Sequence, residues 1–130
     1  MTTRYSAFGE RAYALLRIVA GAMFAFHGVQ KTFGVLSDQP VTDLQIRIGG
    51  FIELTCGTLI ALGLFTSLAA FLASGTMAVA YCQFHWKFQL GKAFFPTINQ
   101  GELALLYCFV FFYMIFHGNG PWSLGANRRG

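Results

Sequence analysis

Residues 46–65 read IRIGGFIELTCGTLIALGLF, an apolar run that contains a single acidic residue, Glu53. About 20 such residues form a helix long enough to cross a hydrocarbon core about 30 Å thick. Because lipid offers no hydrogen bonds, a crossing segment must pair its own backbone N–H and C=O groups, as a helix does. Three comparable runs fill most of the remaining chain, at residues 12–29, 68–84 and 103–116. The sequence therefore predicts an all-α, four-helix transmembrane bundle.

The composition agrees with a multi-pass membrane protein in contact with a lipid bilayer. Of its 130 residues, 55% are hydrophobic and 11% are charged, whereas soluble proteins carry about 25% charged residues. The net charge is +4, but the only adjacent basic residues are Arg128 and Arg129. Nucleic-acid binding needs a clustered basic face, so we expect no nucleic-acid partner. The three cysteines form no C-x-x-C pair and are interpreted as small buried hydrophobes.

Local signals predict where the helices begin and end. We expect spans at about residues 12–33, 46–65, 67–86 and 102–117, within one domain of residues 1–130. Thr42–Gln45 has capping-box spacing and should start the second helix. Gly63 should end that helix, and Thr66 or Ser67 should cap the third.

Four spans would place both termini on the same side of the membrane. Lysines and arginines favour the cytoplasmic side, and their distribution indicates cytoplasmic termini. Arg17, just inside the first span, is expected to reach the headgroups there. The terminal side carries Arg4, Arg11, Arg128 and Arg129, and the loop side carries Arg47, Lys87 and Lys92. Between the spans, the sequence predicts a polar loop at Val35–Gln45, with Asp38 and Pro40, and an aromatic loop at Trp86–Gln100.

This topology gathers polar side chains at the loop end of the bundle, where the first and third helices end and the second and fourth begin. The members of this cluster are His27, Lys31, Glu53, Gln83, His85, Lys87, Asn99 and Glu102.

Glu53 is the most informative member of the cluster. It lies in a stripe of small residues at i+4 spacing, Gly49, Gly57 and Ala61, which should face the other helices. A lone carboxylate near mid-membrane costs several kcal/mol, so Glu53 should be paired. His27 and Lys31, one turn apart on the first helix, are the expected partners. Two interpretations stay open: a buried ion pair that sets helix register, and a functional site.

Other cluster members also have structural interpretations. Glu102 lies three residues after Asn99, where a capping residue is common, and His85 beside Trp86 could anchor its helix in the interface. His27 and His85 could in principle bind a haem axially, but no attachment motif occurs, and we do not expect one. No short H-x-x-x-H spacing supports a metal site. A quinone or lipid headgroup needs an apolar slot with a few polar groups, which the cluster offers.

Four segments of the chain form a pattern by their order and spacing: Phe26-His27-Gly28-Val29-Gln30-Lys31-Thr32-Phe33-Gly34, Gly50-Phe51-Ile52-Glu53 with Gly57 and Leu62-Gly63-Leu64-Phe65-Thr66, Asn99-Gln100-Gly101-Glu102-Leu103-Ala104, and Gly118-Asn119-Gly120-Pro121-Trp122-Ser123-Leu124. Together they make this chain resemble the DoxX family over nearly its whole length. Gly125 departs from the family pattern, which often has an acidic residue there. The resemblance implies a four-helix protein of the bacterial inner membrane. It also implies a link to membrane redox complexes, since the family's namesake is a small subunit that helps pass electrons from sulfur compounds to quinone.

The resulting hypothesis is a membrane subunit of, or accessory to, a quinone-linked oxidoreductase complex, working with other membrane or redox subunits. Glu53 would hold a proton, His27 would hydrogen-bond a quinone oxygen, and Lys31 would stabilise negative charge. The alternative is a non-catalytic scaffold or assembly factor for other membrane subunits. A small-molecule exporter would require a homo-oligomer, because four helices enclose little lumen. The predicted ligand-binding residues, beneath the Trp86–Gln100 loop, are His27, Lys31, Glu53, His85 and Glu102.

Overall fold

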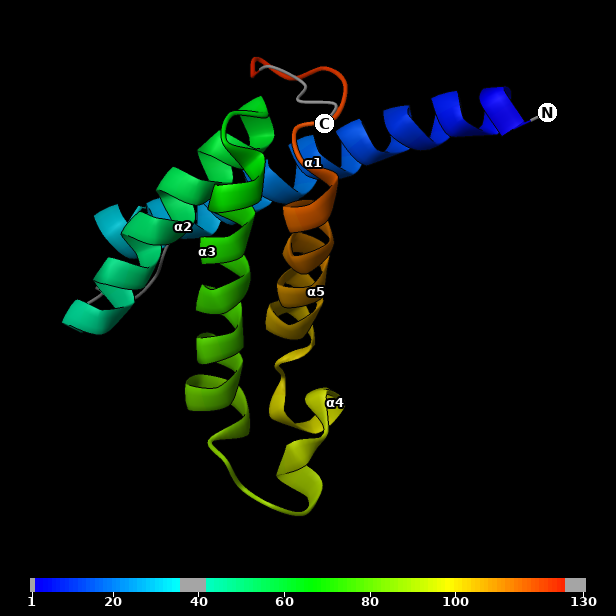
Figure 1. Cartoon of the computed structure of the whole chain (residues 1–130). Coiled ribbons are helices and arrows are strands. Elements are labelled where there is room, and N and C mark those ends of the chain that lie inside the picture. Colours follow the sequence, from blue (N-terminus) through cyan, green and yellow to red (C-terminus); the bar gives the residue numbers. More distant parts are fainter. Residues whose placement is uncertain (1, 36–41, 126–130) are drawn as a thin grey trace.

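The computed structural model describes residues 2–35 and 42–125, and within these ranges all regular structure is helical (Figure 1). This confirms the predicted all-α fold. Asp38 and Pro40 of the predicted polar loop, and the basic pair Arg128 and Arg129, lie outside the described residues. The elements are α1 (Thr2–Phe33), α2 (Leu44–Leu62), α3 (Thr66–Ala80), η1 (Tyr81–Trp86), η2 (Lys92–Phe94), α4 (Pro96–Asn99) and α5 (Glu102–His117).

Three helical segments of the described chain are long and apolar enough to cross a membrane: Arg4–Phe33, Leu44–Leu62 and Thr66–Trp86. The helix at Glu102–His117 is apolar but shorter. Helix α1 begins ten residues before the predicted first span, and its 32 residues measure about 48 Å at about 1.5 Å per residue. Its N-terminal turns extend beyond the rest of the molecule (Figure 1) and are exposed. The helix α1 is therefore longer than a hydrocarbon core is thick.

Helices α1 and α2 pack closely because glycines line their contact. A Cβ atom on Gly57 would lie 2.5 Å from the backbone nitrogen of Ala25. One on Gly21 would lie 2.5 Å from that of Ala61. Small residues allow such backbone approach between membrane helices. The predicted inward direction of the Glu53 stripe is thus confirmed for its Gly57 and Ala61 members, and Glu53 itself is only 2% exposed.

The connection between α2 and α3 is short, because α2 ends at Leu62 and α3 begins at Thr66. Gly63, with φ 71°, ends α2 in the left-handed region, where glycine carries no steric penalty. The predicted start of α2 within Thr42–Gln45 is confirmed, but the predicted capping box is wrong, because Asp43 and not Thr42 is the N-cap and its carboxylate accepts from the backbone N–H of Ile46 at 3.2 Å. The predicted capping of α3 by Thr66 or Ser67 is wrong, because Phe65 occupies the N-cap without a side-chain hydrogen bond. The Asn119 side chain instead accepts from the backbone N–H of Thr66 at 3.1 Å.

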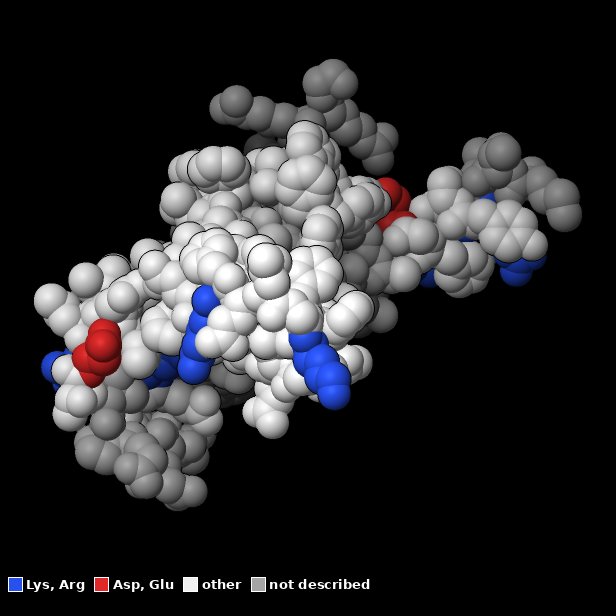
Figure 2. Space-filling model, turned by 90° about the horizontal axis from the view of Figure 1, so that it is seen from below, with Lys and Arg blue, Asp and Glu red and all other residues white. Residues whose placement is uncertain are grey.

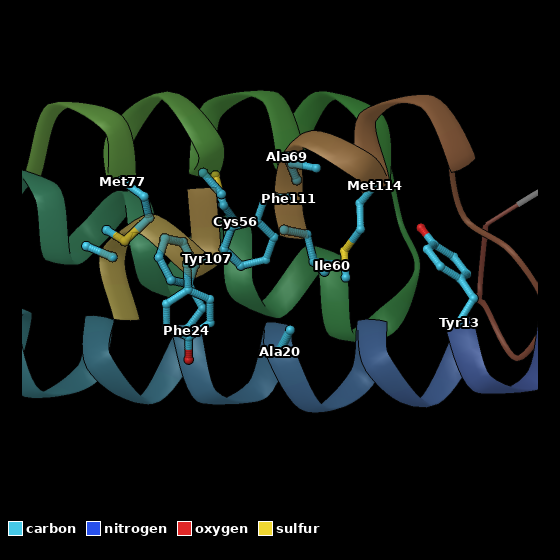
Figure 3. Packing of buried hydrophobic residues seen from close by; sticks show 13 residues of the cluster. Tyr13, Ala20, Phe24, Cys56, Ile60, Ala69, Met77, Tyr107, Phe111 and Met114 are labelled. Atoms are coloured by element: carbon cyan, nitrogen blue, oxygen red, sulfur yellow. The ribbon is translucent and has the colours of Figure 1, made fainter. Parts of the chain in front are cut away.

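The apolar core lies where α1, α2, α3 and α5 converge (Figure 3). Phe24 of α1 and Phe111 of α5 meet edge to face, with ring centroids 4.8 Å apart. Both are almost completely buried, as are Ile60 of α2 and Met114 of α5. Alanines on α3 leave room for these large side chains; they are Ala69, Ala70 and Ala73.

The end of α3 departs from a regular α-helix. Residues 81–86 form the π-helical segment η1, a geometry that often occurs at functional sites. The segment that follows contains η2 and α4, and connects the end of η1 to the start of α5 (Figure 1). Asn99 holds it together, donating to Ala93 at 2.9 Å and accepting from the Gly101 N–H at 2.8 Å. The predicted position of Glu102, three residues after an N-cap at Asn99, is wrong. Gly101 is the N-cap of α5, and Glu102 is its first residue.

Candidate functional site

The predicted pairing of Glu53 with Lys31 is confirmed. Lys31, in the last turn of α1, places its Nζ 2.7 Å from Oε1 of Glu53 in the middle of α2. Gly50 makes this approach possible, since a Cβ there would lie 2.5 Å from the Cβ of Lys31. The two ends differ in environment, because the Glu53 side chain is 2% exposed and that of Lys31 is 37% exposed. The carboxylate is thus enclosed, while the amine lies partly at the surface.

A groove of about 600 Å³ opens beside this pair, between α2 and α3. Two glycines leave it unfilled: a Cβ on Gly49 or Gly75 would meet nothing within 4 Å. Lys31 and Glu53 contribute charge at its wall, and Gln45 of α2 and His85 of η1 add polar groups. The remaining lining is mainly apolar and includes Ile48, Ile52, Phe71, Leu72, Val79 and Phe84.

A second, smaller cavity, the chamber, has a volume of about 270 Å³ and lies among α1, α3, η1 and α5. Four residues line both cavities: Lys31, Glu53, Ala80 and His85. The ion pair therefore belongs to the wall that separates the groove from the chamber. The residues that line only the chamber are Phe24, His27, Met77, Gln100, Leu103, Ala104 and Tyr107.

The structure brings four of the five predicted site residues together. Lys31, Glu53 and His85 line both cavities, and His27 lines the chamber. The ring of His85 is held by its Nδ1, 3.3 Å from the backbone oxygen of Asn99. Glu102 is exposed at the start of α5 and lines neither cavity. Of the predicted set, Glu102 is thus the residue that lies apart.

Tyr107 is a site residue that the sequence did not reveal. It lies on α5 within the chamber wall, with its ring 6.3 Å from that of His27 and nearly perpendicular to it. Its hydroxyl group is buried, as is Oε2 of Glu53, and neither atom has a hydrogen-bond partner among the described residues. A tyrosine inside an apolar run carries no spacing signal of its own, so only the fold shows that it faces the carboxylate's cavity.

A second polar cluster lies at the other end of the helices, around Arg17. The expectation that Arg17 reaches the headgroups is wrong, because its side chain is completely buried. Its Nη1 donates to the backbone oxygens of Asn119 and, at 2.8 Å, Pro121. Its Nη2 donates to that of Trp122 at 2.6 Å. Arg17 thus satisfies the carbonyls of a C-terminal turn, Gly118–Gly125, which follows α5.

Further hydrogen bonds hold this turn against the bundle. The Tyr13 hydroxyl donates to the backbone oxygen of Gly118 at 2.6 Å. The N–H groups of Leu124 and Gly125 donate to the carbonyls of Leu62 and Gly63, at 2.9 and 3.1 Å. Neither the groove nor the chamber is lined by Arg17, so its cluster is structural. Two sequence signals were available, namely an arginine within an apolar run and the motif at residues 118–124. No short-range sequence pattern indicates that the two segments contact each other.

Charge is sparse on the molecular face that carries α4. Figure 2 views the molecule from that end and shows separated basic side chains on a surface that is mostly uncharged, without a continuous basic patch. Among the described residues, no group of three or more His, Cys, Asp or Glu side chains is placed to hold a metal ion. A ligand in the two cavities would therefore meet an amine, a carboxylate, two imidazoles and a phenol.

Comparison with known proteins gives two matches. The DoxX family model matches residues 12–86, which is more than half of the chain and extends from α1 to η1. A protein of Haemophilus influenzae named "Uncharacterized protein" is 42% identical over 116 residues. That similarity covers 85% of this chain and 86% of the relative. No solved structure matches the chain.

Proposed function

This chain belongs to the DoxX family of membrane proteins, and we propose that it is a membrane subunit of, or accessory to, a quinone-linked oxidoreductase complex. The quinone headgroup binds at the Lys31–Glu53 end of the groove, and its apolar tail lies between α2 and α3. The chain spans the bacterial inner membrane four times as one domain, with α5 as the fourth span and both termini in the cytoplasm.

The observation that carries this proposal is a buried ion pair that opens onto a large apolar groove. Small-molecule sites are typically cavities of about 300–1,000 Å³, mostly apolar, with a few polar groups that fix orientation. The groove has about 600 Å³ and this kind of lining. A lipid-soluble quinone has matching chemistry, because its ring oxygens accept hydrogen bonds and its tail is apolar.

Each polar residue at the head of the groove has a distinct part in this proposal. The Lys31 ammonium donates to a ring oxygen and stabilises the negative charge that develops on reduction. His85 lines the same cavity and is positioned as a second donor. Glu53 holds Lys31 in place and accepts or releases a proton. His27 lines the chamber and not the groove. It therefore influences Glu53 from the chamber side and does not contact the quinone ring.

Contacts between the chain ends support the proposed membrane arrangement. His117, which ends α5, lies with its Nε2 3.2 Å from a carboxylate oxygen of Glu10. The neighbouring Tyr13–Gly118 hydrogen bond joins the same two segments at 2.6 Å. The N-terminal half of α1 and the end of α5 therefore lie at one end of the molecule, as expected if both termini are on one side.

A non-catalytic scaffold is the second candidate function, favoured by the exposed aromatic surface of α5. Phe109, Phe112 and Phe116 are all more than half exposed, and aromatic side chains are common at the centre of protein–protein interfaces. In this candidate the Lys31–Glu53 pair only sets the register of α1 against α2. Replacing Glu53 by leucine would then alter assembly without removing any ligand binding.

The test is equilibrium binding of a short-chain ubiquinone analogue to the purified protein in lipid nanodiscs. Gly75→Leu should abolish binding, because it fills the groove where a new side chain meets no neighbouring atom. Gly9→Leu is the matched control, since Gly9 is equally open but lies on exposed α1, outside the groove. Glu53→Gln should weaken binding. Native protein that neither binds the analogue nor retains quinone on purification would overturn the proposal.

A further inference from the structure

Two residues that line the chamber, Glu53 and Tyr107, each carry a buried polar atom that is unpaired among the described residues. The atoms are Oε2 of Glu53 and the hydroxyl oxygen of Tyr107, from side chains that are 2% and 6% exposed. Neither has a hydrogen-bond partner within residues 2–35 and 42–125. An unpaired polar group is costly in any protein interior and more so within a hydrocarbon layer. Both atoms therefore need a hydrogen-bond partner that residues 2–35 and 42–125 do not supply.

The size and lining of the chamber identify water as the molecule that suits it. A water molecule in a protein needs two to four polar partners and about 30 Å³ of space. The chamber has about 270 Å³, with His27 and His85 in its wall beside Glu53 and Tyr107. Cavities that stay dry are lined by apolar groups alone. Room for several waters thus coincides with the unpaired atoms.

The chamber also extends to the surface of the protein. Gln100, which lines it, is exposed in the turn between α4 and α5, whereas Glu53 lies at its buried end. The chamber wall therefore runs from an exposed loop residue to an enclosed carboxylate. A chain of water along this path would join the two.

We propose that the chamber holds exchangeable water that bonds to Glu53 and Tyr107 and connects the buried ion pair to the solution at the α4 end. Both cavities are lined mainly by apolar groups, but polar groups make up a larger share of the chamber wall than of the groove wall, and Glu53 belongs to both walls. In this arrangement an apolar ligand reaches the ion pair from one cavity and solution protons reach it from the other. The delivery of protons to a bound ligand rests on the proposed function, whereas the presence of water in the chamber does not.

Hydroxyl-radical footprinting of the native protein in nanodiscs tests this proposal. Radicals generated from water by X-rays label the side chains that contact that water, including buried ones. Met77 lines the chamber and Met114 lies in the core away from it, although both are buried, at 5% and 0% exposure. Met77 should be labelled several-fold faster than Met114. Mixing with heavy-oxygen water just before exposure should place the heavy isotope on Met77 and Tyr107.

Two cavity-filling variants separate this inference from quinone binding. Ala104→Leu adds bulk to the chamber wall, and should bring Met77 labelling down to the level of Met114. Gly75→Leu fills only the groove, and should leave Met77 labelling unchanged while quinone binding is lost. Equal labelling of Met77 and Met114 in the native protein would overturn the proposal, and this comparison decides even if Ala104→Leu does not fold. Native protein that binds no quinone analogue but shows rapid Met77 labelling would count only against the proposed function.

Discussion

Lys31 and Glu53 are 22 residues apart in sequence, yet the Lys31 Nζ lies 2.7 Å from the Glu53 Oε1. Their environments are unequal, because the carboxylate side chain is 2% exposed and the lysine side chain 37% exposed. The lysine is therefore the partner that can reach water when the pair is broken, and the glutamate is the one that cannot. This asymmetry makes the effects of single substitutions unequal.

Lys31→Met should lower the free energy of unfolding by about 3 kcal/mol, because it leaves the Glu53 carboxylate buried without its counter-ion. Glu53→Leu should cost less, since the flexible lysine can extend its amine to the surface. The double variant should recover part of the loss of Lys31→Met. Denaturant unfolding in mild detergent measures all three, and Lys92→Met, at an exposed position, is the control. If Lys31→Met and Glu53→Leu lowered the free energy of unfolding equally, the two members of the ion pair would be equally buried, contrary to this prediction.

Arg17→Met should release the C-terminal turn. The guanidinium donates to three backbone carbonyls in that turn, and each hydrogen bond to a charged group contributes about 1.5–3 kcal/mol. Hydrogen exchange should quicken at the Leu124 and Gly125 amides, which are bonded to Leu62 and Gly63. Arg11→Met, on an exposed part of α1, should leave these rates unchanged. Persistent protection of both amides in Arg17→Met would mean that the strand-like pairing with Leu62 and Gly63 holds the turn by itself.

Gly57→Ala should destabilise the protein, because the new Cβ would lie 2.5 Å from the backbone nitrogen of Ala25. Overpacking of this kind costs about 1–3 kcal/mol. Gly9→Ala is the matched control within the same bundle, since a Cβ there meets nothing within 4 Å. Alanine should even favour that helix by about 0.5–1 kcal/mol relative to glycine. Thermal unfolding should thus shift in opposite directions for the two variants, and a parallel shift would refute the close α1–α2 contact.

Asn119→Ala should loosen the first turn of α3 by about 1 kcal/mol, a typical contribution of a helix cap. The Asn119 side chain accepts from the Thr66 N–H across 53 residues of sequence, in place of the local cap that α3 lacks. Amide exchange at Thr66 should accelerate, whereas amides near Ala73, in the middle of α3, should keep their rates. Gln89→Ala, at an exposed loop position, serves as the control. An unchanged Thr66 rate would show that the first turn of α3 is held by other contacts.

Several features could be predicted because they depend on short-range pattern and on the membrane as solvent. Long apolar runs dictate helices, since a lipid-facing backbone must pair its own polar groups. Gly63 ends α2 as predicted, and α2 begins within the predicted Thr42–Gln45 segment, because both signals act within one turn. The inward direction of Glu53 follows from the small residues at i+4 spacing along the same helix face. Its pairing with Lys31 follows from the cost of leaving a carboxylate alone.

Other features depended on which distant segments meet, and no local pattern contains that information. Arg17 is buried because the chain returns after α5 and presents three carbonyls to it, more than a hundred residues later. Tyr107 reaches the chamber because it lies one turn from Leu103 and Ala104 on the inward face of α5, whereas Glu102 is exposed, and only the packing of α5 decides which face points inward. The sequence by itself determined the helices, the two ends of α2, and the ion pair, since these follow from local propensity and solvation. The tertiary structure alone decided the two cavities and the docked C-terminal turn, since a cavity is the space left when several helices pack, and packing is a property of all of them together.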